Sequence, residues 1–416
     1  MRDTELYQHL LGLVPPWTAS RVALDVAAGR VDVWAEHGKK ARFECPECNK
    51  PCGLYDHDEE RVWRHLDSCQ FQTFLHARIP RVRCDEHGVR QARVPWAEPK
   101  SRFTMMFERL AIDVMLHMDL KNAGRLLGLS WDEAHHIQER AVARGLARRE
   151  AAPPRVLGVD EKAIAKRHQY GTLLVDLERG CVLEVAKDRR IDSLQACFDS
   201  LGEGALENVE AIAMDMWEPF IQATLAALPG ADTKIVFDRF HIAQHLGKAV
   251  DIVRRAENRN LVAEGDTRLV GSKHLWLFNE HNVPERRQAE FAKLKHARLK
   301  TARAWAMKEA FRDFWELHDQ AEGRTFFRHW LGWAARSRLA PMKKVARMIE
   351  RHLTNVLTYF DHRVTNAASE AINAGVQLLS SRARGFRNFA NFRVAILFRH
   401  GALDLHPGRN AQILPT

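Results

Sequence analysis

The fold of this chain is decided by the stretch Val156-Leu157-Gly158-Val159-Asp160, an apolar run that ends in an acid. A second, largely apolar run, Val209 to Met214, also ends in an acid, Asp215. Both runs predict strands. A third acid, Glu370, lies in a stretch predicted to be helical, Ala367 to Leu379. Two aspartates at strand ends and one glutamate on a helix are the residues that a site for two divalent ions needs.

These carboxylates favour Mg²⁺ or Mn²⁺, because hard cations prefer oxygen ligands. Two such ions, roughly 3.5–4 Å apart, activate an attacking oxygen and stabilise a leaving oxygen at one phosphate. A single acid after a strand carries little weight, since most such acids are solvated strand ends or helix N-caps. The assignment of Asp160, Asp215 and Glu370 as catalytic residues and as ligands of two ions therefore depends on the rest of the sequence.

The elements around the two aspartates predict an α/β domain. Strands are expected at 156–160, 171–177, 181–186, 209–214 and 234–237, and helices at 193–201 and 218–228. Three strands in a meander, followed by alternating helices and strands, are typical of an RNase H-like domain. From about 240 to 359 the pattern is helical. Because 155 residues separate Asp215 from Glu370, the helical stretch is interpreted as an insertion ahead of the glutamate helix.

The end of the chain resembles the C-terminal signature of insertion-sequence transposases of the ISL-three family. The stretches that carry the resemblance are Thr365 to Asn373 and Arg382 to Phe389, and the most specific piece is Gly385 to Arg393. The resemblance covers most of the chain and implies that Glu370 is the last acid of an Asp-Asp-Glu triad. It also implies an N-terminal zinc-binding domain, a helix-turn-helix and an all-α insertion.

The expected fold class is multidomain, α/β plus all-α: an N-terminal zinc ribbon, a helix-turn-helix, and an RNase H-like catalytic core interrupted by an all-α insertion. The expected boundaries are an N-terminal segment at 1–40, a zinc-binding domain at 41–97, a helix-turn-helix DNA-binding domain at 101–150, the first part of the core at 155–242, the insertion at 243–362, the glutamate helix with a basic C-terminal part at 363–400, and a tail at 401–416. Pro153 and Pro154 mark the linker ahead of the core, because two prolines stop a helix.

Cysteine and histidine spacing indicates a zinc site. Cys45 and Cys48 form one pair, Cys84 and His87 form another, and two intervening residues let both members of a pair reach one tetrahedral ion. The gap between the pairs exceeds the usual range, and strands expected at 74–79 and 81–83 would fill it. Four further residues compete with His87 for the fourth position: Cys52, Cys69, His57 and His65. The other interpretation is a set of reduced structural cysteines without metal.

Residues 120–137 favour a helix-turn-helix. Ser130 and Glu133 form a capping box, which starts a helix by satisfying its free N–H groups, and Gly128 fits the turn. The second helix carries four residues expected near base edges or phosphates, namely His135, Gln138, Glu139 and Arg140. A plain helical hairpin explains the same pattern, and the resemblance favours DNA binding.

Asp238-Arg239-Phe240-His241 follows the last expected core strand. An Asp-x-x-His at this point resembles a motif of transposases with inserted helical domains, which implies that Asp238 and His241 support the active site. The competing interpretation is a helix N-cap at Asp238 and a buried histidine.

Basic residues gather in the insertion and after the glutamate helix. Four arginines are expected to neutralise phosphates near the scissile bond: Arg382, Arg384, Arg387 and Arg393. Within the insertion, basic residues between Arg286 and Arg303 precede aromatic residues, of which one is expected to stack on an unpaired base. The candidates are Trp305, Phe311, Trp315, Trp330 and Trp333. The alternative is a solvated helix face above an apolar core.

The amino-acid composition limits the classes of protein to which this chain can belong. The chain has 416 residues, a net charge of +10 and 46% hydrophobic residues. These values fit a basic globular protein of about two to four domains that binds a polyanion. Seven cysteines, four of them between 45 and 69, favour metal binding in a reducing compartment over disulfides.

Several functional classes have no support. The sequence contains no apolar run of 18 residues, no signal peptide at Met1 to Glu5 and no Gly-Lys-Ser/Thr loop. We therefore expect no membrane partner and no nucleotide cofactor. The expected location is the cytoplasm, on the bacterial nucleoid when the protein is bound to DNA.

These features predict a DDE transposase. It is expected to bind double-stranded DNA at the terminal inverted repeats of an insertion sequence and at target DNA, with two catalytic Mg²⁺ or Mn²⁺ ions and a structural Zn²⁺. Two ends must meet, so a homodimer or larger assembly is expected. The alternatives are a non-catalytic DNA-binding regulator, against which the three acids argue, and an RNase H-like nuclease, which needs no helix-turn-helix.

Overall fold

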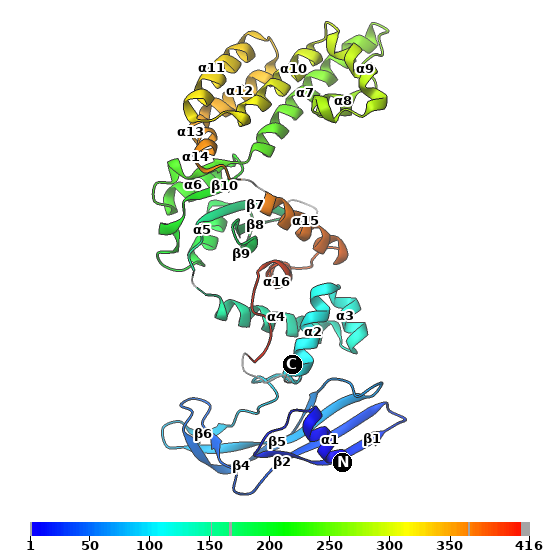
Figure 1. The fold of residues 1–416 in the computed structure, drawn as a ribbon, viewed down its shortest axis with the longest axis vertical. Helices are drawn as coiled ribbons and strands as arrows, with labels where there is room; N and C mark the ends of the chain where they lie inside the picture. Colours follow the sequence, from blue (N-terminus) through cyan, green and yellow to red (C-terminus); the bar gives the residue numbers. More distant parts are fainter. Residues whose placement is uncertain (1, 151, 166–168, 365–366, 409–416) are drawn as a thin grey trace. The chain divides into compact units, whose positions relative to one another are not determined.

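The computed structural model describes residues 2–150, 152–165, 169–364 and 367–408. Thr365 and Asn366 of the C-terminal signature, and residues 409–416 of the expected tail, lie outside the described residues. The chain divides into two compact units: the first comprises Met1–Arg149 with Leu403–Thr416, and the second comprises Glu150–Ala402. Figure 1 labels the elements of both units.

The first unit contains a sheet with strand order β1-β2-β5-β4-β3, and β6 also pairs with β5. The strands are β1 (Trp17–Asp25), β2 (Arg30–His37), β3 (Phe43–Glu44), β4 (Pro51–Arg64), β5 (Gln72–Cys84) and β6 (Gly88–Gln91), and the helix α1 (Asp3–Leu10) precedes them. The parallel pairing of β2 with β5 joins the N-terminal residues and the zinc ribbon in one sheet. The long β4–β5 hairpin fills the gap between the two ligand pairs, and the strands expected at 74–79 and 81–83 are both parts of β5.

The alternating apolar residues from Val22 to Val33 predict one strand in this unit, and that prediction is wrong. The stretch from Val22 to Val33 is two antiparallel strands, and the turn between them comprises residues 26–29. Asp25 Oδ1 accepts a hydrogen bond from Ala28 N at 2.9 Å, and Gly29 closes the turn with φ +63°. The turn cannot be recognised from the pattern of apolar residues, because the same alternation continues through both strands.

The helix-turn-helix prediction is confirmed. Three helices follow the sheet: α2 (Met105–His117), α3 (Leu120–Leu127) and α4 (Trp131–Arg148). Gly128 ends α3 with φ +67°, a left-handed conformation that glycine adopts without steric cost. The capping box forms as expected, since Ser130 Oγ accepts from Glu133 N at 3.2 Å and Glu133 Oε2 accepts from Ser130 N at 3.0 Å.

The residues after 402 belong to the first unit although they end the chain. Arg148 of α4 donates from Nη1 to the His406 carbonyl at 2.7 Å and to Asp404 Oδ2 at 3.1 Å. A Cβ on Gly145 would lie 2.6 Å from Leu403 Cβ, so only glycine allows this close approach. The described part of the expected tail therefore packs along α4.

The second unit is built on a five-stranded sheet in the order β11-β10-β7-β8-β9. The strands are β7 (Val156–Ala165), β8 (Gln169–Asp176), β9 (Cys181–Lys187), β10 (Ala211–Met214) and β11 (Ile235–Phe237). The strands β7, β8 and β9 form an antiparallel meander, and β10 and β11 extend the sheet in parallel with β7. This is the RNase H-like arrangement that the sequence predicts.

Helices cover both faces of this sheet. Leu157 and Val159 face α5 (Ile191–Asp199) and α6 (Glu218–Ala227), whose Leu194, Phe198 and Phe220 share their apolar core. On the opposite face, α15 (Ala367–Arg382) contacts β7 and α16 (Phe389–His400) contacts β9. Figure 1 shows α15 beside β7. Residues 158 and 160 therefore face the glutamate helix, because alternate residues of a strand point to opposite faces.

The all-α insertion is confirmed, and it begins with a helix of 25 residues, α7 (Arg239–Ala263), directly after β11. The further helices are α8 (Lys273–Leu277), α9 (Glu285–His296), α10 (Lys300–Ala310), α11 (Gln320–Arg336), α12 (Ala340–Arg351), α13 (Leu353–Leu357) and α14 (Tyr359–His362). Short 3₁₀ turns are η1 (Ala205–Asn208) and η2 (Ala231–Thr233) in the core and η3 (Glu280–Asn282) and η4 (Phe311–Glu316) in the insertion. Figure 1 shows α7 to α12 gathered in one helical lobe.

The aromatic residues of the insertion form its core. Trp305, Phe311, Trp315 and Trp330 are all buried, and Trp330 Nε1 donates to the Met307 carbonyl at 2.9 Å. Of the five aromatic residues considered for base stacking, Trp333 alone is exposed, at 40%. The other four aromatic residues therefore belong to the apolar core, as the alternative interpretation holds.

Among the described residues, no helix combines the length and the apolar character that crossing a bilayer requires.

We expect Gly323→Ala to destabilise the helical lobe by about 1–3 kcal/mol, the usual cost of overpacking. The new Cβ would lie 2.6 Å from Phe360 Cε2 and 2.7 Å from Leu357 Cδ2. Gly332→Ala in the same helix is the control, because its Cβ would meet the flexible Arg336 guanidinium at 3.4 Å. That change should raise stability by up to about 1 kcal/mol. Hydrogen exchange of the α11 amides measures both, and equal protection in the two variants would contradict the close packing at Gly323.

Candidate active site

The register of two parallel strands brings the two aspartates level. Ala213 of β10 pairs with Gly158 of β7. Asp160 lies two residues beyond Gly158 in β7, and Asp215 lies two residues beyond Ala213, directly after β10, so the two acids come level at this edge of the sheet. Neighbouring strands lie about 4.8 Å apart, which sets the two carboxylates side by side.

A third acid joins this row from the next strand. Met214 of β10 pairs with Phe237 of β11, so Asp238 comes level with Asp215. Asp238 also caps α7, where its Oδ1 accepts a hydrogen bond from Phe240 N at 2.8 Å. The ligand atoms of Asp215, Asp238 and His241 lie within 4.8 Å of one another, a grouping that could hold a metal ion.

His241 binds the second aspartate of the row. Its Nδ1 forms an ion pair with Asp215 Oδ1, and its Nε2 lies 3.9 Å from Asp238 Oδ2. Burial alone would lower the pKa of His241, but the hydrogen bond and charge of Asp215, with the charges of Asp238 and Asp160, raise that pKa above its ordinary value. Asp238 is therefore the helix N-cap of the competing interpretation, and His241, which is half-buried, contacts a predicted catalytic acid.

Asp160 is held by the helix that carries the predicted glutamate. Asn373 of α15 donates from Nδ2 to Asp160 Oδ2, and Glu161 N donates to Asp160 Oδ1 at 2.6 Å. Burial raises the pKa of the Asp160 carboxyl, and the charge of Asp215 raises it further, although Asn373 and Lys162 act against this. A bound cation would oppose the same effect, because positive charge favours the ionised carboxylate.

Glu370 lies one residue from a close contact between α15 and β7. A Cβ on Gly158 would lie 2.9 Å from Ser369 Oγ, so the missing side chain of the glycine lets the helix approach the strand. Glu370 itself is exposed, three residues before Asn373 on the same helix. Within the described residues, Asp160 and Glu370 fall outside the 4.8 Å grouping around Asp215.

The donor set of this region fits a hard divalent cation. Asp160 and Asp215 offer carboxylate oxygens in one row, and Glu370 lies on the adjacent helix α15. Oxygen ligands of this kind suit Mg²⁺ and Mn²⁺. Two neighbouring carboxylates repel each other unless a cation or a proton lies between them.

The structure gives the predicted DNA-binding arginines different surroundings. Arg140 donates to Glu108 at 2.5 Å, and Arg393 donates to Glu184 at 2.6 and 2.7 Å. Glu108 is 1% exposed, so its charge requires its partners Arg140 and Arg144. Arg382, Arg384 and Arg387, in contrast, are exposed. Arg140 and Arg393 thus stabilise their own domains, and the other three remain available to bind phosphates.

On α4, the second helix of the helix-turn-helix, some of the residues predicted to contact DNA are also buried within the protein. His135 and Gln138 of α4 are buried, and the His135 ring stacks on Trp131. Glu139 is exposed, as are Trp131 and His136. The surface that α4 offers to DNA therefore begins with Trp131 and leaves out two of the four predicted residues.

Two functional candidates were not identified from the sequence. Asn373 lies in the quoted signature, and its spacing of three from Glu370 puts it on the same helix face, which is a signal for a residue of the site. Trp217 follows Asp215 by two residues, and its backbone N donates to the Asp215 carbonyl at 2.7 Å. An exposed tryptophan so close to a predicted catalytic acid is a further signal.

The predicted zinc ligands come together in the first unit. The ligand atoms of Cys45, Cys48, Cys84 and His87 lie within 4.8 Å of one another. Cys48 Sγ is 3.7 Å from Cys84 Sγ, and His87 Nδ1 is 3.6 Å from Cys84 Sγ. Sulfurs on one tetrahedral zinc lie about 3.8 Å apart, because each Zn–S bond is about 2.3 Å. Backbone N–H groups of His87 and Glu86 lower the pKa of the Cys84 thiol to about 7, which favours the thiolate ligand.

The competing ligands lie outside this group. Cys52 donates to the Lys50 carbonyl at 3.3 Å, and His57 Nε2 contacts His37 Nε2 at 2.8 Å. His65 is buried with Nδ1 2.9 Å from Thr104 Oγ1. Cys69 is exposed. Among the described residues, His87 is therefore the one that completes the group of three cysteines.

Three family models match consecutive parts of the chain. Residues 41–87 match the zinc-finger of transposases IS204/IS1001/IS1096/IS1165, and residues 92–142 match the helix-turn-helix domain of transposase family ISL3. Residues 157–396, more than half of the chain, match the DDE transposase model of ISL3. The three matches follow the order of the zinc group, the helix-turn-helix and the sheet with its acids.

Two curated relatives align with most of this chain. The transposase for insertion sequence element IS1557 of Mycobacterium tuberculosis is 26% identical over 440 aligned residues, which cover 99% of this chain and 98% of the relative. The transposase for insertion sequence element IS1001 of Bordetella parapertussis is 23% identical over 356 residues, covering 85% of this chain and 87% of the relative.

We expect the purified protein to contain one zinc per chain and Cys48→Ser to contain almost none, because loss of one thiolate opens the tetrahedral site. Cys52→Ser is the matched control, since this buried cysteine lies outside the ligand group. Elemental analysis of protein prepared in metal-free buffer measures both variants. Zinc that disappears in Cys52→Ser and persists in Cys48→Ser would assign the ligands differently.

Proposed function

This chain belongs to the ISL3 family of DDE transposases, and we propose that it cuts DNA at the terminal inverted repeats of an insertion sequence. The freed 3′-hydroxyl then attacks target DNA. The protein would act in the cytoplasm, on the bacterial nucleoid when it is bound to DNA. A homodimer or larger assembly follows from the need to hold two ends together.

The observation that carries the proposal is the row of acids on adjacent parallel strands, with the glutamate helix packed against β7 at Gly158. Asp160, Asp215 and Glu370 are the residues that would hold two Mg²⁺ or Mn²⁺ ions. Such ions, when bound, activate an attacking oxygen and stabilise the leaving oxygen of a phosphodiester. Because the reaction passes directly between DNA and water or a 3′-hydroxyl, no serine or tyrosine nucleophile is assigned.

The neighbouring side chains orient the acids. The Asn373 amide donates a hydrogen bond to one carboxylate oxygen of Asp160 and does not contact the other. His241 fixes one oxygen of Asp215, and Asp238 fixes the first turn of α7, which carries His241. These contacts reduce the freedom of the carboxylates before DNA binds, which is how groups around a metal site raise its affinity.

The zinc ribbon and the helix-turn-helix are proposed to bind the inverted repeats, with a structural zinc in the ribbon. The α4 helix would enter the major groove with its N-terminal residues, beginning at the exposed Trp131. In the second unit, Arg382, Arg384 and Arg387 follow the glutamate helix and would neutralise phosphates near the cut.

The first test is selection of bound duplexes from a random-sequence pool, followed by addition of Mg²⁺. A selected sequence that is nicked at one position supports a sequence-specific transposase. If the protein binds the selected sequence but makes no metal-dependent cut, even in a DNA that carries two copies of it as paired ends, the result would support the non-catalytic regulator. Cutting without sequence preference would support the RNase H-like nuclease.

Asp160→Asn should reduce cleavage at least about 100-fold, equivalent to about 2.7 kcal/mol of lost transition-state stabilisation, because the amide is a poor ligand for a divalent ion. Binding to selected ends should be unchanged, since the substitution preserves size. Asp199→Asn, at an exposed position on α5, is the matched control. Gel-shift and nicking assays on the same duplex measure the two activities, and retained cleavage would remove Asp160 from the mechanism.

Asn373→Ala should reduce cleavage by about 10- to 100-fold at limiting Mg²⁺, the usual effect of losing a side chain that orients a metal ligand. Higher Mg²⁺ should restore much of the rate, because the ligands themselves are intact. Gln377→Ala removes an exposed amide from the same helix and should leave the Mg²⁺ dependence unchanged. A uniform loss of rate at every Mg²⁺ concentration would indicate damage to the helix instead of altered positioning of Asp160.

A further inference from the structure

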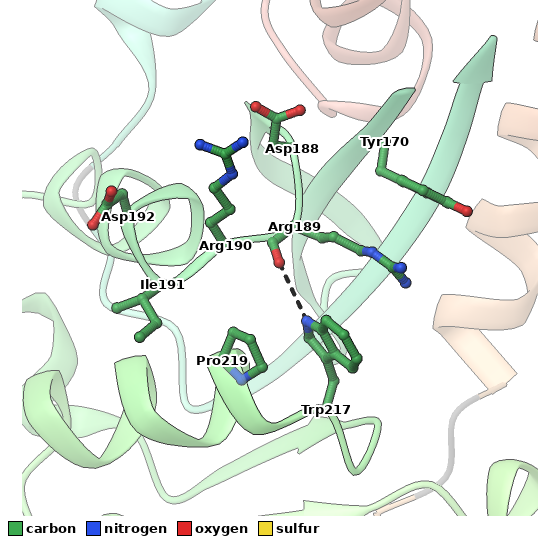
Figure 2. A pocket seen from close by; sticks show the side chains of 8 residues that line it. All are labelled: Tyr170, Asp188, Arg189, Arg190, Ile191, Asp192, Trp217 and Pro219. Atoms are coloured by element: carbon green, nitrogen blue, oxygen red, sulfur yellow. Dashed lines mark hydrogen bonds between the residues drawn. The ribbon is translucent and has the colours of Figure 1, made fainter. Parts of the chain in front are cut away.

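A hollow of about 620 Å³ opens on the face of the second unit that α5 and α6 cover (Figure 2). It is lined by residues from β8, from the loop after β9 and from the first turns of α5 and α6: Tyr170, Asp188, Arg189, Arg190, Ile191, Asp192, Trp217 and Pro219. A volume of this size lies within the range of small-ligand sites. No residue of this pocket has a part in the cleavage mechanism above.

One wall of the pocket is fixed by an arginine between two aromatic rings. The Arg189 guanidinium carbon lies 4.4 Å from the Tyr170 ring centre and 4.6 Å from the Trp217 ring centre. Glu161 accepts from Arg189 Nη1 at 3.0 Å, and Trp217 Nε1 donates to the Arg189 carbonyl at 3.2 Å. Figure 2 shows the last bond and the Arg189 side chain extending between the two rings. The indole is therefore held in one orientation, yet Trp217 remains 38% exposed.

The pocket adjoins the row of acids through neighbouring residues. Trp217 follows Asp215 by two positions, and Glu161 follows Asp160 directly. Consecutive strand residues point to opposite faces, so Glu161 and the pocket lie across β7 from the Asp160 carboxylate. A ligand that reaches both must pass around the end of β10. A nucleotide displaced from a duplex beside the cut has that freedom, whereas a base stacked within the duplex does not.

The chemistry of the pocket selects a planar, uncharged group. Trp217, Ile191 and Pro219 offer apolar contact area, and Figure 2 shows Ile191 and Pro219 on the side away from Tyr170. The charges of Arg189 and Arg190 are balanced by those of Asp188 and Asp192. This balance disfavours a site for a bare anion. Carboxylates and guanidinium groups at the rim can pair with the amino and carbonyl groups of a nucleobase.

We propose that this pocket receives an unpaired DNA base from the strand next to the scissile phosphate, with Trp217 as the stacking surface. The inference rests on the proposed function and adds a DNA-binding subsite to it. Extruding a base loses stacking within the duplex, and stacking on an aromatic side chain replaces part of that loss. The pocket would hold the distorted strand so that the scissile phosphate stays at the acids.

The experiment uses the full-length protein and the duplex whose cut position has been mapped. We expect Trp217→Ala to cut the fully paired duplex about 10- to 100-fold more slowly than wild type, the range expected for loss of one base-stacking contact. Trp217→Phe should retain most of the rate. A duplex with an abasic nucleotide at the captured position should be cut equally by wild type and Trp217→Ala, because no base remains to be stacked.

Phe278→Ala is the matched control, since Phe278 has a similar exposure of 37% and follows α8 in the helical lobe. It should cut both duplexes at the wild-type rate. Phe240→Ala tests the other exposed aromatic residue close to the acids. Rescue by the abasic nucleotide in Phe240→Ala but not in Trp217→Ala would move the stacking surface to Phe240 and overturn the proposal. Equal slowing of Trp217→Ala on both duplexes would also overturn it.

A second readout separates this inference from the proposed function. 2-Aminopurine replaces one base at a time across the selected duplex, and its fluorescence is recorded on binding to Asp160→Asn, which leaves the DNA intact. We expect a change at one position that disappears in Asp160→Asn combined with Trp217→Ala. A wild-type protein that never cuts but gives this Trp217-dependent signal would refute the proposed cleavage and support the pocket. Identical fluorescence with and without Trp217 would refute the pocket, whether or not the DNA is cut.

Discussion

The proposed active site depends on the register between β7, β10 and β11. Each residue of β10, from Ala211 to Met214, is buried, so this apolar run fixes how far the strand extends before the first acid emerges. Its parallel partners are fixed in the same way, and Asp160 and Asp238 therefore come level with Asp215. A slip of one residue would turn each acid toward the opposite face of the sheet. The positions of the proposed catalytic groups are thus set by packing beneath them, before any metal or DNA binds.

Much of the fold could be predicted because it follows from local patterns. Apolar runs, the capping box at Ser130 and the paired ligands of the zinc ribbon each depend on residues close together in sequence. The hairpin turn at residues 26–29 was missed because the same apolar alternation continues through both of its strands. The parallel pairing of β2 with β5 and the packing of Leu403 on α4 were also missed, since both join segments far apart along the chain.

The same distinction applies to the site. The row of acids could be found from sequence, since an acid directly after a buried strand is a local feature. The partners of individual side chains could not, and Arg393 illustrates why: its sequence surroundings suggest phosphate binding, but Glu184, 209 residues away, binds its guanidinium. The insertion is a second example, because the sequence positions of aromatic residues such as Trp305 and Trp330 fit a base-binding surface and an apolar core equally well. Only tertiary packing distinguishes the two.

The α7 helix connects the sheet that precedes the acids to the helical lobe. Its first turn carries His241, which binds Asp215, and the same helix continues without interruption for 25 residues into the helical lobe. At 1.5 Å per residue, it is a rod of about 37 Å. A continuous helix transmits tilt along its length, and the Asp238 cap attaches its near end to the sheet. If DNA pushed on the lobe at the far end of α7, the helix would therefore tilt as one unit. The first group near the acids to shift would be the imidazole of His241.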